Sequence, residues 1–349
     1  AVLPAFGLVF DEPSRILGLG AAALIMVLVG VADDLWDLDW TVKLAAQILA
    51  AGVLAWQGIQ LYTLPIGGQT IVSPYVSLII TVFTVVLVMN AVNFIDGLDG
   101  LVAGVAIIAG GVFFVYAYLL QIRAQTEYFN LASLTTAIRI GACAGFWPLN
   151  RYPAKLFMGD AGALLVGLMM AASTISITGR IDSSGATGDE LFTAYFAPAC
   201  IPLLLPLAVL VIPLLDFSMA VIRRLRAGKS PFTADRKHLH HRLLDMGHTH
   251  PNAVRVLYAW TFTASVGVLL YMFVPWWVAT LAIVAGFAVC AIVTLSPLTR
   301  HKARELAAQR GDGGAPAIYD ELDAASEELV DAEAAAAEDA AQRTKEDAE

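Results

Sequence analysis

The sequence contains nine long apolar runs separated by polar segments. An α-helix of about 20 residues crosses the ~30 Å hydrocarbon core of a bilayer, so the runs predict an all-α polytopic membrane protein. Two of them, 44–58 and 161–178, are short and rich in small residues, which favours packing inside a helix bundle over contact with lipid. The nine runs are 16–32, 44–58, 75–92, 99–120, 132–148, 161–178, 193–215, 254–274 and 276–297.

The composition agrees with this interpretation. Apolar residues make up 58% of the chain and charged residues 15%, whereas soluble domains are nearer one-half apolar and about one-quarter charged. A net charge of −9 argues against a nucleic-acid partner. Cys143, Cys200 and Cys290 lie far apart in apolar runs, which indicates small core residues rather than a disulfide framework or a zinc site.

The segments between the runs differ in basic charge. If the runs alternate across the membrane, one side collects fourteen Lys and Arg residues up to residue 310 and the other collects three. Cytoplasmic loops carry the excess of basic residues, so the first side is predicted to face the cytoplasm from the plasma membrane. This side consists of 33–43, 90–98, 149–160, 216–253 and the tail from 298.

The remaining segments predict three parts of the chain. Residues 1–15 are interpreted as the remnant of a truncated N-terminal span and outer loop, and 16–297 as the transmembrane domain. Residues 298–349 hold fourteen acidic and six basic residues, which predicts a disordered cytoplasmic tail. Residues 61–72 alternate around two glycines and predict a small outer hairpin.

Unusual polar residues gather on the predicted cytoplasmic side. Asp33 and Asp34 end the first run, where carboxylates are unfavourable with the helix dipole. A cation is therefore expected beside them, and Lys43 stands at the start of the next run. The alternative is a solvated acidic loop at the membrane boundary, which is the favoured interpretation for Asp37 and Asp39.

Two further clusters lie between later runs. Asn90, Asn93 and Asp96 recur every three residues and share one side of a helix, followed by Asp99 beside glycines. So many polar groups between two spans indicate a function. The third cluster, in NRYPAKLFMGDAG, contains Asn150, Lys155, Phe157 and Asp160, although Asp160 could equally be a plain helix cap.

The fourth cluster is DRKHLHHRLLDMGH, with three histidines flanked by arginines. Donors to a phosphorylated substrate fit this pattern better than a zinc site, because no cysteine lies nearby. Mg²⁺ prefers oxygen ligands and substrate phosphates, and phosphoryl transfer requires mostly positioning and charge neutralisation. The four clusters therefore predict Mg²⁺-dependent phosphoryl transfer at the inner membrane face, without a GxxxxGK[ST] loop.

The clusters resemble those of a known family. The strings GVADDLWDLDWTVKLAAQ, NAVNFIDGLDGL, PAKLFMGDAG and DRKHLHHRLLDMGH are similar to the polyprenyl-phosphate N-acetylhexosamine-1-phosphate transferases of bacterial glycosyl transferase family 4. The likeness covers 16–297, and His-Leu-His-His resembles the branch that uses UDP-GlcNAc. The alanine-rich composition resembles actinobacterial members, whose acceptor is decaprenyl phosphate. Family members have two further N-terminal spans, which implies eleven spans in the full protein.

The resemblance implies that GlcNAc-1-phosphate passes from UDP-GlcNAc to a membrane polyprenyl phosphate, with release of UMP. It also implies that Asp160 and Asn93 ligate Mg²⁺, with Mn²⁺ as an alternative ion, and that Lys43 holds the phosphates. Asp33 and Asp34 would face the lipid phosphate. The resemblance also allows a homodimer. Direct attack by the lipid phosphate is favoured over a covalent aspartate step, because a phosphate monoester with a second pKa near 6 is mostly dianionic at neutral pH.

The resemblance also implies substrate contacts. Phe157 would stack on uracil, and Asp99 would bind the edge of the base or the neighbouring backbone. The alternatives are another donor such as UDP-MurNAc-pentapeptide, an inactive scaffold, or a transporter, which would carry charges at mid-membrane or on both sides. The full predicted substrate-binding set is Asp96, Asp99, Asn150, Lys155, Phe157, Arg236, His238, His240 and His241.

Overall fold

A computed structural model describes most of the predicted transmembrane domain. The described residues are 13–65, 69–71, 73–124, 131–178 and 246–309, with single positions at 208, 218, 222, 226 and 243. This part is helical apart from one pair of short strands. The helices are α2 (Pro13–Trp36), α3 (Trp40–Trp56), α4 (Pro74–Phe94), α5 (Leu101–Ala124), α6 (Leu131–Asn150), α7 (Gly159–Thr178), α11 (His250–Leu270) and α12 (Trp276–Gln309).

Six of these helices, α2, α4, α5, α7, α11 and α12, are long and apolar enough to cross a membrane. The chain is thus a polytopic helical membrane protein, as predicted. The runs 44–58 and 132–148 coincide with α3 and α6, which are helical but fall outside this set. α3 has only 17 residues, and α6 buries Ser, Thr and Arg side chains. The run 193–215 lies almost wholly outside the described residues.

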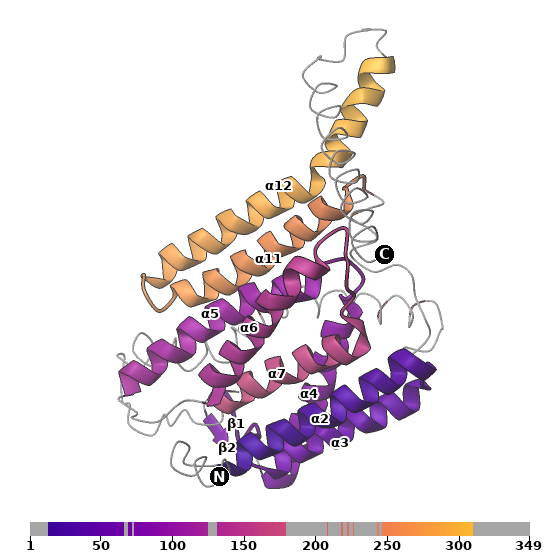
Figure 1. Cartoon of the computed structure of the whole chain (residues 1–349). Helices are drawn as coiled ribbons and strands as arrows, with labels where there is room; N and C mark the ends of the chain where they lie inside the picture. Colours follow the sequence, from indigo (N-terminus) through magenta and orange to yellow (C-terminus); the bar gives the residue numbers. More distant parts are fainter. Residues whose placement is uncertain are drawn as a thin grey trace.

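The helices form a bundle, with α12 at one side and α3 at the other (Figure 1). α11 packs against α12 and α5, and α5 packs against α6. α7 contacts α2, α4 and α6, and α2 contacts α3. A single apolar core runs through most of these helices. The prediction that 161–178 packs inside the bundle is confirmed, because α7 buries most of its side chains.

α3 differs from the prediction for 44–58. It buries one face, including Ala50, Ala51 and Leu54, but exposes Ile48 and Leu49. The reason is that α3 packs mainly against α2 and α4, which leaves the face that carries Ile48 and Leu49 uncovered by the described helices. Small residues here permit close packing on one side without burying the whole helix.

The two strands lie within the segment predicted as a hairpin. β1 (Thr63–Pro65) pairs antiparallel with β2 (Gln69–Ile71), and the pairs run from Thr63 with Ile71 to Pro65 with Gln69. Cys143 and Cys290 are buried and free, in agreement with their interpretation as core residues.

Arg139 is a buried cation in the middle of α6. Its side chain is 3% exposed and lies against α5, where a Cβ added at Gly110 would be 3.1 Å from its Nη2. Its Nε has no hydrogen-bond partner among the described residues. A guanidinium in this position is expensive, and glycine at position 110 provides the space for it.

Candidate active site

Three of the four predicted polar clusters meet at one end of the bundle. Asp33 lies near the end of α2, Lys43 in the first turn of α3, Asn93 near the end of α4 and Asp160 in the first turn of α7. Helices that cross in alternating directions bring every second connection to the same end. Residues as far apart as 117 positions therefore come into direct contact.

Lys43 joins two carboxylates at the centre of this cluster. Its Nζ lies 2.6 Å from Asp33 Oδ2 and 3.2 Å from Asp160 Oδ2. Asn93 Nδ2 donates to the other oxygen of Asp160 at 3.0 Å, and the Leu38 N–H donates to Asp33 Oδ1 at 2.9 Å. The cation expected beside the aspartate pair is thus present, and within that pair its contact is with Asp33. The side chain of Asp160 contacts other helices and is therefore more than a plain helix cap.

Asp34 contacts the start of α7. Its Oδ1 accepts a hydrogen bond from the Asp160 N–H at 3.2 Å, where the helix dipole favours a carboxylate. Gly159 has φ of +66°, and a Cβ there would lie 2.7 Å from Asp34 Oδ2. One turn earlier on α2, a Cβ at Gly30 would lie 2.7 Å from the backbone nitrogen of Ala161. Glycine at both positions lets α2 and α7 approach closely at the site.

Asp37 and Asp39 are both exposed, as predicted for a solvated acidic loop at the membrane boundary. Asp39 is the N-cap of α3 and accepts from the Thr41 backbone N–H at 2.8 Å and from the Thr41 hydroxyl at 2.6 Å. These hydrogen bonds hold the pKa of Asp39 below its usual range. Asp37 is exposed and adopts φ of +49° in the turn between α2 and α3.

Asn90 does not join Asn93 in the cluster. Its Nδ2 donates to Gln47 Oε1 at 2.6 Å and to Val86 O at 2.8 Å. Gln47 is buried, so this pair connects α4 to α3 inside the bundle. Asn90 thus lies about one helical turn deeper in the bundle than Asn93 does.

Asp96 and Asp99 lie in the turn between α4 and α5. Asp99 Oδ2 accepts from the Ala154 N–H at 3.0 Å, a backbone contact of the kind the resemblance implied. Burial and the nearby charges of Asp160, Asp34 and Asp99 raise the pKa of Asp96 to about 7. Asp96 therefore lies close enough to Asp160, which also pairs with Lys43, to be influenced by its charge.

Asn150, predicted to contact substrate, makes two backbone hydrogen bonds within the chain. It is 4% exposed, its Oδ1 accepts from the Gly100 N–H at 3.1 Å, and its Nδ2 donates to Leu156 O at 2.9 Å. It thus connects the Asp96–Gly100 turn to the segment that leads to α7. Lys155 and Phe157 on that segment are exposed, Phe157 by 74%, as a stacking residue has to be before its ligand binds.

Two aromatic residues near the site are not distinguished by any sequence pattern. Tyr258 of α11 donates its hydroxyl hydrogen to Gly100 O, and Trp147 Nε1 of α6 donates to the Tyr258 hydroxyl at 3.1 Å. Both lie inside apolar runs, where an aromatic residue normally indicates core packing. No sequence signal could have separated them from such residues.

The structure describes residues 243 and 246–248 of the fourth cluster, and His248 Nε2 donates to Thr294 O at 2.9 Å. His250 begins α11, and its ring stacks on Tyr152 with centroids 5.5 Å apart and planes inclined by 22°. This contact brings the chain that follows the cluster to the segment carrying Lys155 and Phe157. The predicted residues outside the described part are Arg236, His238, His240 and His241.

Asp160 and Asn93 provide the oxygen-bearing side chains predicted to bind Mg²⁺. Within the described residues, no three His, Cys, Asp or Glu side chains are grouped to hold a metal ion. Asp160 and Asn93 nevertheless present a carboxylate and an amide 3.0 Å apart, and the amide offers its oxygen when it turns over. Mg²⁺ commonly takes one or two carboxylates and completes its shell with substrate phosphates and water. The residues present therefore fit an ion that binds together with a phosphorylated substrate.

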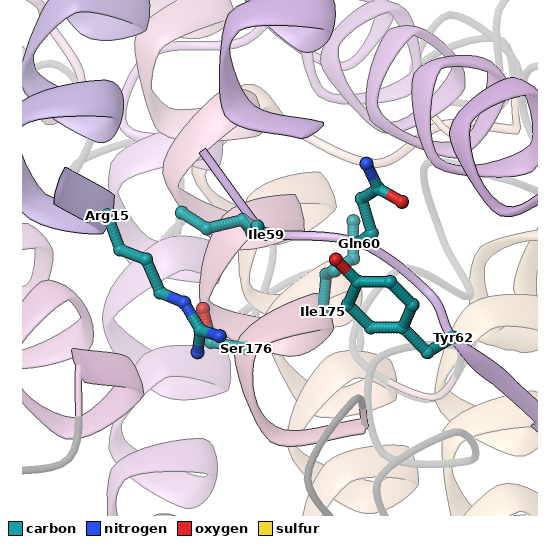
Figure 2. A pocket seen from close by; sticks show the side chains of 7 residues that line it. Arg15, Ile59, Gln60, Tyr62, Ile175 and Ser176 are labelled. Carbon is teal, nitrogen blue, oxygen red and sulfur yellow. The ribbon is translucent and has the colours of Figure 1, made fainter. Parts of the chain in front are cut away.

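A separate pocket lies at the opposite end of the bundle. Figure 2 shows Arg15 of α2 and Tyr62, from the segment after α3, turned toward this pocket above Ile175 of α7. Arg15 and Asp33 are 18 positions apart on α2, or about 27 Å at 1.5 Å per residue. The pocket is therefore remote from the cluster around Lys43.

Comparisons with known proteins show which family the chain resembles. The sequence model of glycosyl transferase family 4 matches residues 16–178. The decaprenyl-phosphate N-acetylglucosaminephosphotransferase of Mycolicibacterium smegmatis is 36% identical over 286 residues, which is 80% of this chain and 69% of the relative. The protein of that name from Mycobacterium leprae is 33% identical over a match that covers 86% of this chain and 75% of the relative. The undecaprenyl-phosphate alpha-N-acetylglucosaminyl 1-phosphate transferase of Escherichia coli is 32% identical over 76% of this chain and 69% of its own.

The chain belongs to glycosyl transferase family 4. The family match extends from α2 to the end of α7 and therefore includes Asp33, Lys43, Asn93 and Asp160. It ends before the histidine cluster, which only the longer matches to individual relatives reach. The family predicted from the four strings is confirmed.

Proposed function

We propose that this chain transfers GlcNAc-1-phosphate from UDP-GlcNAc to a membrane polyprenyl phosphate. An acceptor phosphate oxygen forms a bond to the phosphorus that carries the sugar, and the bond from that phosphorus to the oxygen shared with UMP breaks. The products are polyprenyl-diphospho-GlcNAc and UMP. The names of relatives at 33–36% identity support the reaction and the lipid.

The main support within the chain is the cluster in which Lys43 lies between Asp33 and Asp160. It combines a mobile cationic side chain with carboxylates at a membrane boundary, which suits a reaction between two phosphorylated partners. Asp160 and Asn93 would hold Mg²⁺, which neutralises charge on the donor diphosphate when bound. Lys43 would orient the phosphates, and Asp33 and Asp34 would face the lipid phosphate.

The exposed segment before α7 would bind the nucleotide. Phe157 offers an exposed ring for the uracil base, and Lys155 lies two residues before it. Asp99 fixes the backbone at Ala154, so the segment is held against the Asp96 turn. From the fourth cluster, Arg236, His238, His240 and His241 would bind the diphosphate and sugar.

The proposal places this chemistry on the cytoplasmic face of the plasma membrane. The described basic residues at the end of the bundle near the site include Lys43, Arg151 and Lys155, whereas Arg15 lies at the other end. Cytoplasmic connections carry such an excess. Nine spans in this chain and an outer position for β1 and β2 belong to the same proposal.

UMP release by the purified chain in detergent tests the function. The assay contains UDP-GlcNAc, polyprenyl phosphate and Mg²⁺, with UDP-MurNAc-pentapeptide as a second donor in parallel. Lipid-dependent release is expected from UDP-GlcNAc, and Asp160→Asn should abolish it. Asp39→Asn is the matched control, because asparagine caps a helix as well as aspartate does. UMP release without the lipid, or from the second donor alone, would contradict the proposal.

A further inference from the structure

Tyr258 connects a distant helix to the turn that carries Asp96 and Asp99. Its hydroxyl donates to the carbonyl oxygen of Gly100 and accepts from Trp147 Nε1 at 3.1 Å. The phenol therefore makes one bond as a donor and one as an acceptor, and it links α11, the end of the turn and α6. Only this hydroxyl, among the described residues, joins these three elements.

The turn has little freedom to move away from this contact. Gly100 has φ of +78°, a conformation that residues with a side chain rarely adopt. A Cβ at this position would lie 3.3 Å from Arg151 Cα and 3.5 Å from Trp147 Nε1. Its N–H donates to Asn150 Oδ1 at 3.1 Å, so both backbone groups of Gly100 are engaged.

The same network reaches the segment before α7. Asn150, which accepts from the Gly100 N–H, also donates from its Nδ2 to Leu156 O at 2.9 Å. Asp99 adds a second connection through the Ala154 N–H at 3.0 Å. The turn from Asp96 to Gly100 and the segment from residue 151 to residue 157 therefore form one hydrogen-bonded block.

α5 leaves space for this arrangement. A Cβ at Gly104 would lie 2.5 Å from Tyr258 Cε1 and would also overlap Cζ and the hydroxyl oxygen. Alanine at position 104 would therefore displace the phenol from Gly100. Gly111, on the same helix, has nothing within 4 Å of an added Cβ, so alanine there leaves the network intact.

We propose that Tyr258 is a positioning residue that holds the nucleotide-binding block in its binding geometry. This inference rests on the proposed function, because it takes Phe157 and the turn as the donor site. Asp33, Lys43, Asn93 and Asp160 are held by one another and not by Tyr258. Loss of the hydroxyl should therefore weaken donor binding and leave the contacts of the phosphate cluster in place.

The test compares Tyr258→Phe with Tyr271→Phe. Tyr271 lies at the other end of α11, and its hydroxyl makes an exposed hydrogen bond to Thr280 at 2.9 Å. In the UMP-release assay, Tyr258→Phe should raise the KM for UDP-GlcNAc about tenfold, with kcat and the KM for polyprenyl phosphate changed less than twofold. A factor of ten is what one hydrogen bond to a buried group commonly contributes. Tyr271→Phe should leave all three constants unchanged.

Amide hydrogen exchange on the same proteins gives a readout that does not depend on activity. Tyr258→Phe should speed exchange in residues 96–101 and 151–157, whereas Tyr271→Phe should not. Gly104→Ala should reproduce the effect of Tyr258→Phe, and Gly111→Ala should match the wild type.

The two proposals fail in different ways. If the wild-type chain releases no UMP from any donor, the proposed function fails, and the exchange data still decide whether Tyr258 organises the block. If UMP is released but Tyr258→Phe changes neither the donor KM nor the exchange, the inference is overturned. An equal change in kcat and in both KM values would likewise overturn it, because that pattern indicates general destabilisation.

Discussion

Replacing Gly30 by alanine should damage the site without touching any of its polar groups. The added Cβ would lie 2.7 Å from Ala161 N and 2.8 Å from Ala161 Cβ, whereas non-bonded carbons rest about 3.5–4.0 Å apart. α2 and α7 must therefore separate by about 1 Å at this level. Because the bond from the Asp160 N–H to Asp34 Oδ1 is already 3.2 Å long, a further 1 Å would break it.

The expected magnitude follows from two opposing terms. Overpacking costs about 1–3 kcal/mol, while alanine in a helix is favoured over glycine by about 1 kcal/mol. Gly20→Ala on the same helix is the matched control, since nothing lies within 4 Å of its added Cβ. The control should be as stable as the wild type or more so, and Gly30→Ala should be less stable than the control by about 1–3 kcal/mol.

Catalysis should respond more strongly than stability. A displacement of about 1 Å near reacting groups can lower the rate about 10²-fold. We therefore expect Gly30→Ala to reduce kcat for UMP release by about that factor, with thermal unfolding in detergent showing that the protein is still folded. If Gly30→Ala turns over like Gly20→Ala, the close approach of α2 and α7 does not control the position of Asp34 and Asp160, and the reasoning is refuted.

Four other substitutions test charges in the bundle. Burial and nearby carboxylates raise the pKa of Asp96 to about 7, so the folded state should lose stability as pH rises from about 4 to 7. Asp96→Asn should remove this loss. If the melting temperatures of the two proteins fall equally over this pH range, the prediction is contradicted. Lys43→Met should lower the rate of UMP release about 10²-fold at every pH. For Asp33→Asn, the loss of activity should become smaller as pH rises, because the acceptor phosphate then becomes dianionic without a base. A pH-independent loss of activity in Asp33→Asn would count against this. Arg139→Met should raise the melting temperature, because the buried guanidinium Nε has no partner in the described part of the chain and a buried donor without a partner is costly. A lower melting temperature would contradict this.

The position of the site could be predicted because the membrane restricts where polar residues can lie. Polar residues that end or begin apolar runs must gather at the two faces, so Asp33, Lys43 and Asp160 could be assigned to one face from the alternation of runs. The expectation of a cation beside Asp33 followed from helix electrostatics alone. These predictions needed only the length and order of the runs.

The individual contacts could not be predicted in the same way. An asparagine amide binds a ligand and supports a loop with the same atoms, so nothing in the sequence distinguishes Asn150 or Asn90 from Asn93. Their partners depend on depth in the bundle and on helix rotation, which spacing along one helix does not fix. Tyr258 is a stronger case, because its partner Gly100 lies 158 residues away and its own run shows no polar pattern.

The cluster around Lys43 contains more carboxylates than one Mg²⁺ ion requires. Lys43 is within 3.2 Å of two carboxylates, and Asp34 and Asp96 add two more acidic groups nearby. A centre with this surplus of negative charge repels a phosphate dianion unless cations enter with it. On the proposed function, the donor therefore has to bind as a complex with its cation before the lipid phosphate can approach. The same surplus contributes to the raised pKa of Asp96, so a divalent cation that enters with the donor should lower that pKa and reduce the pH dependence of stability.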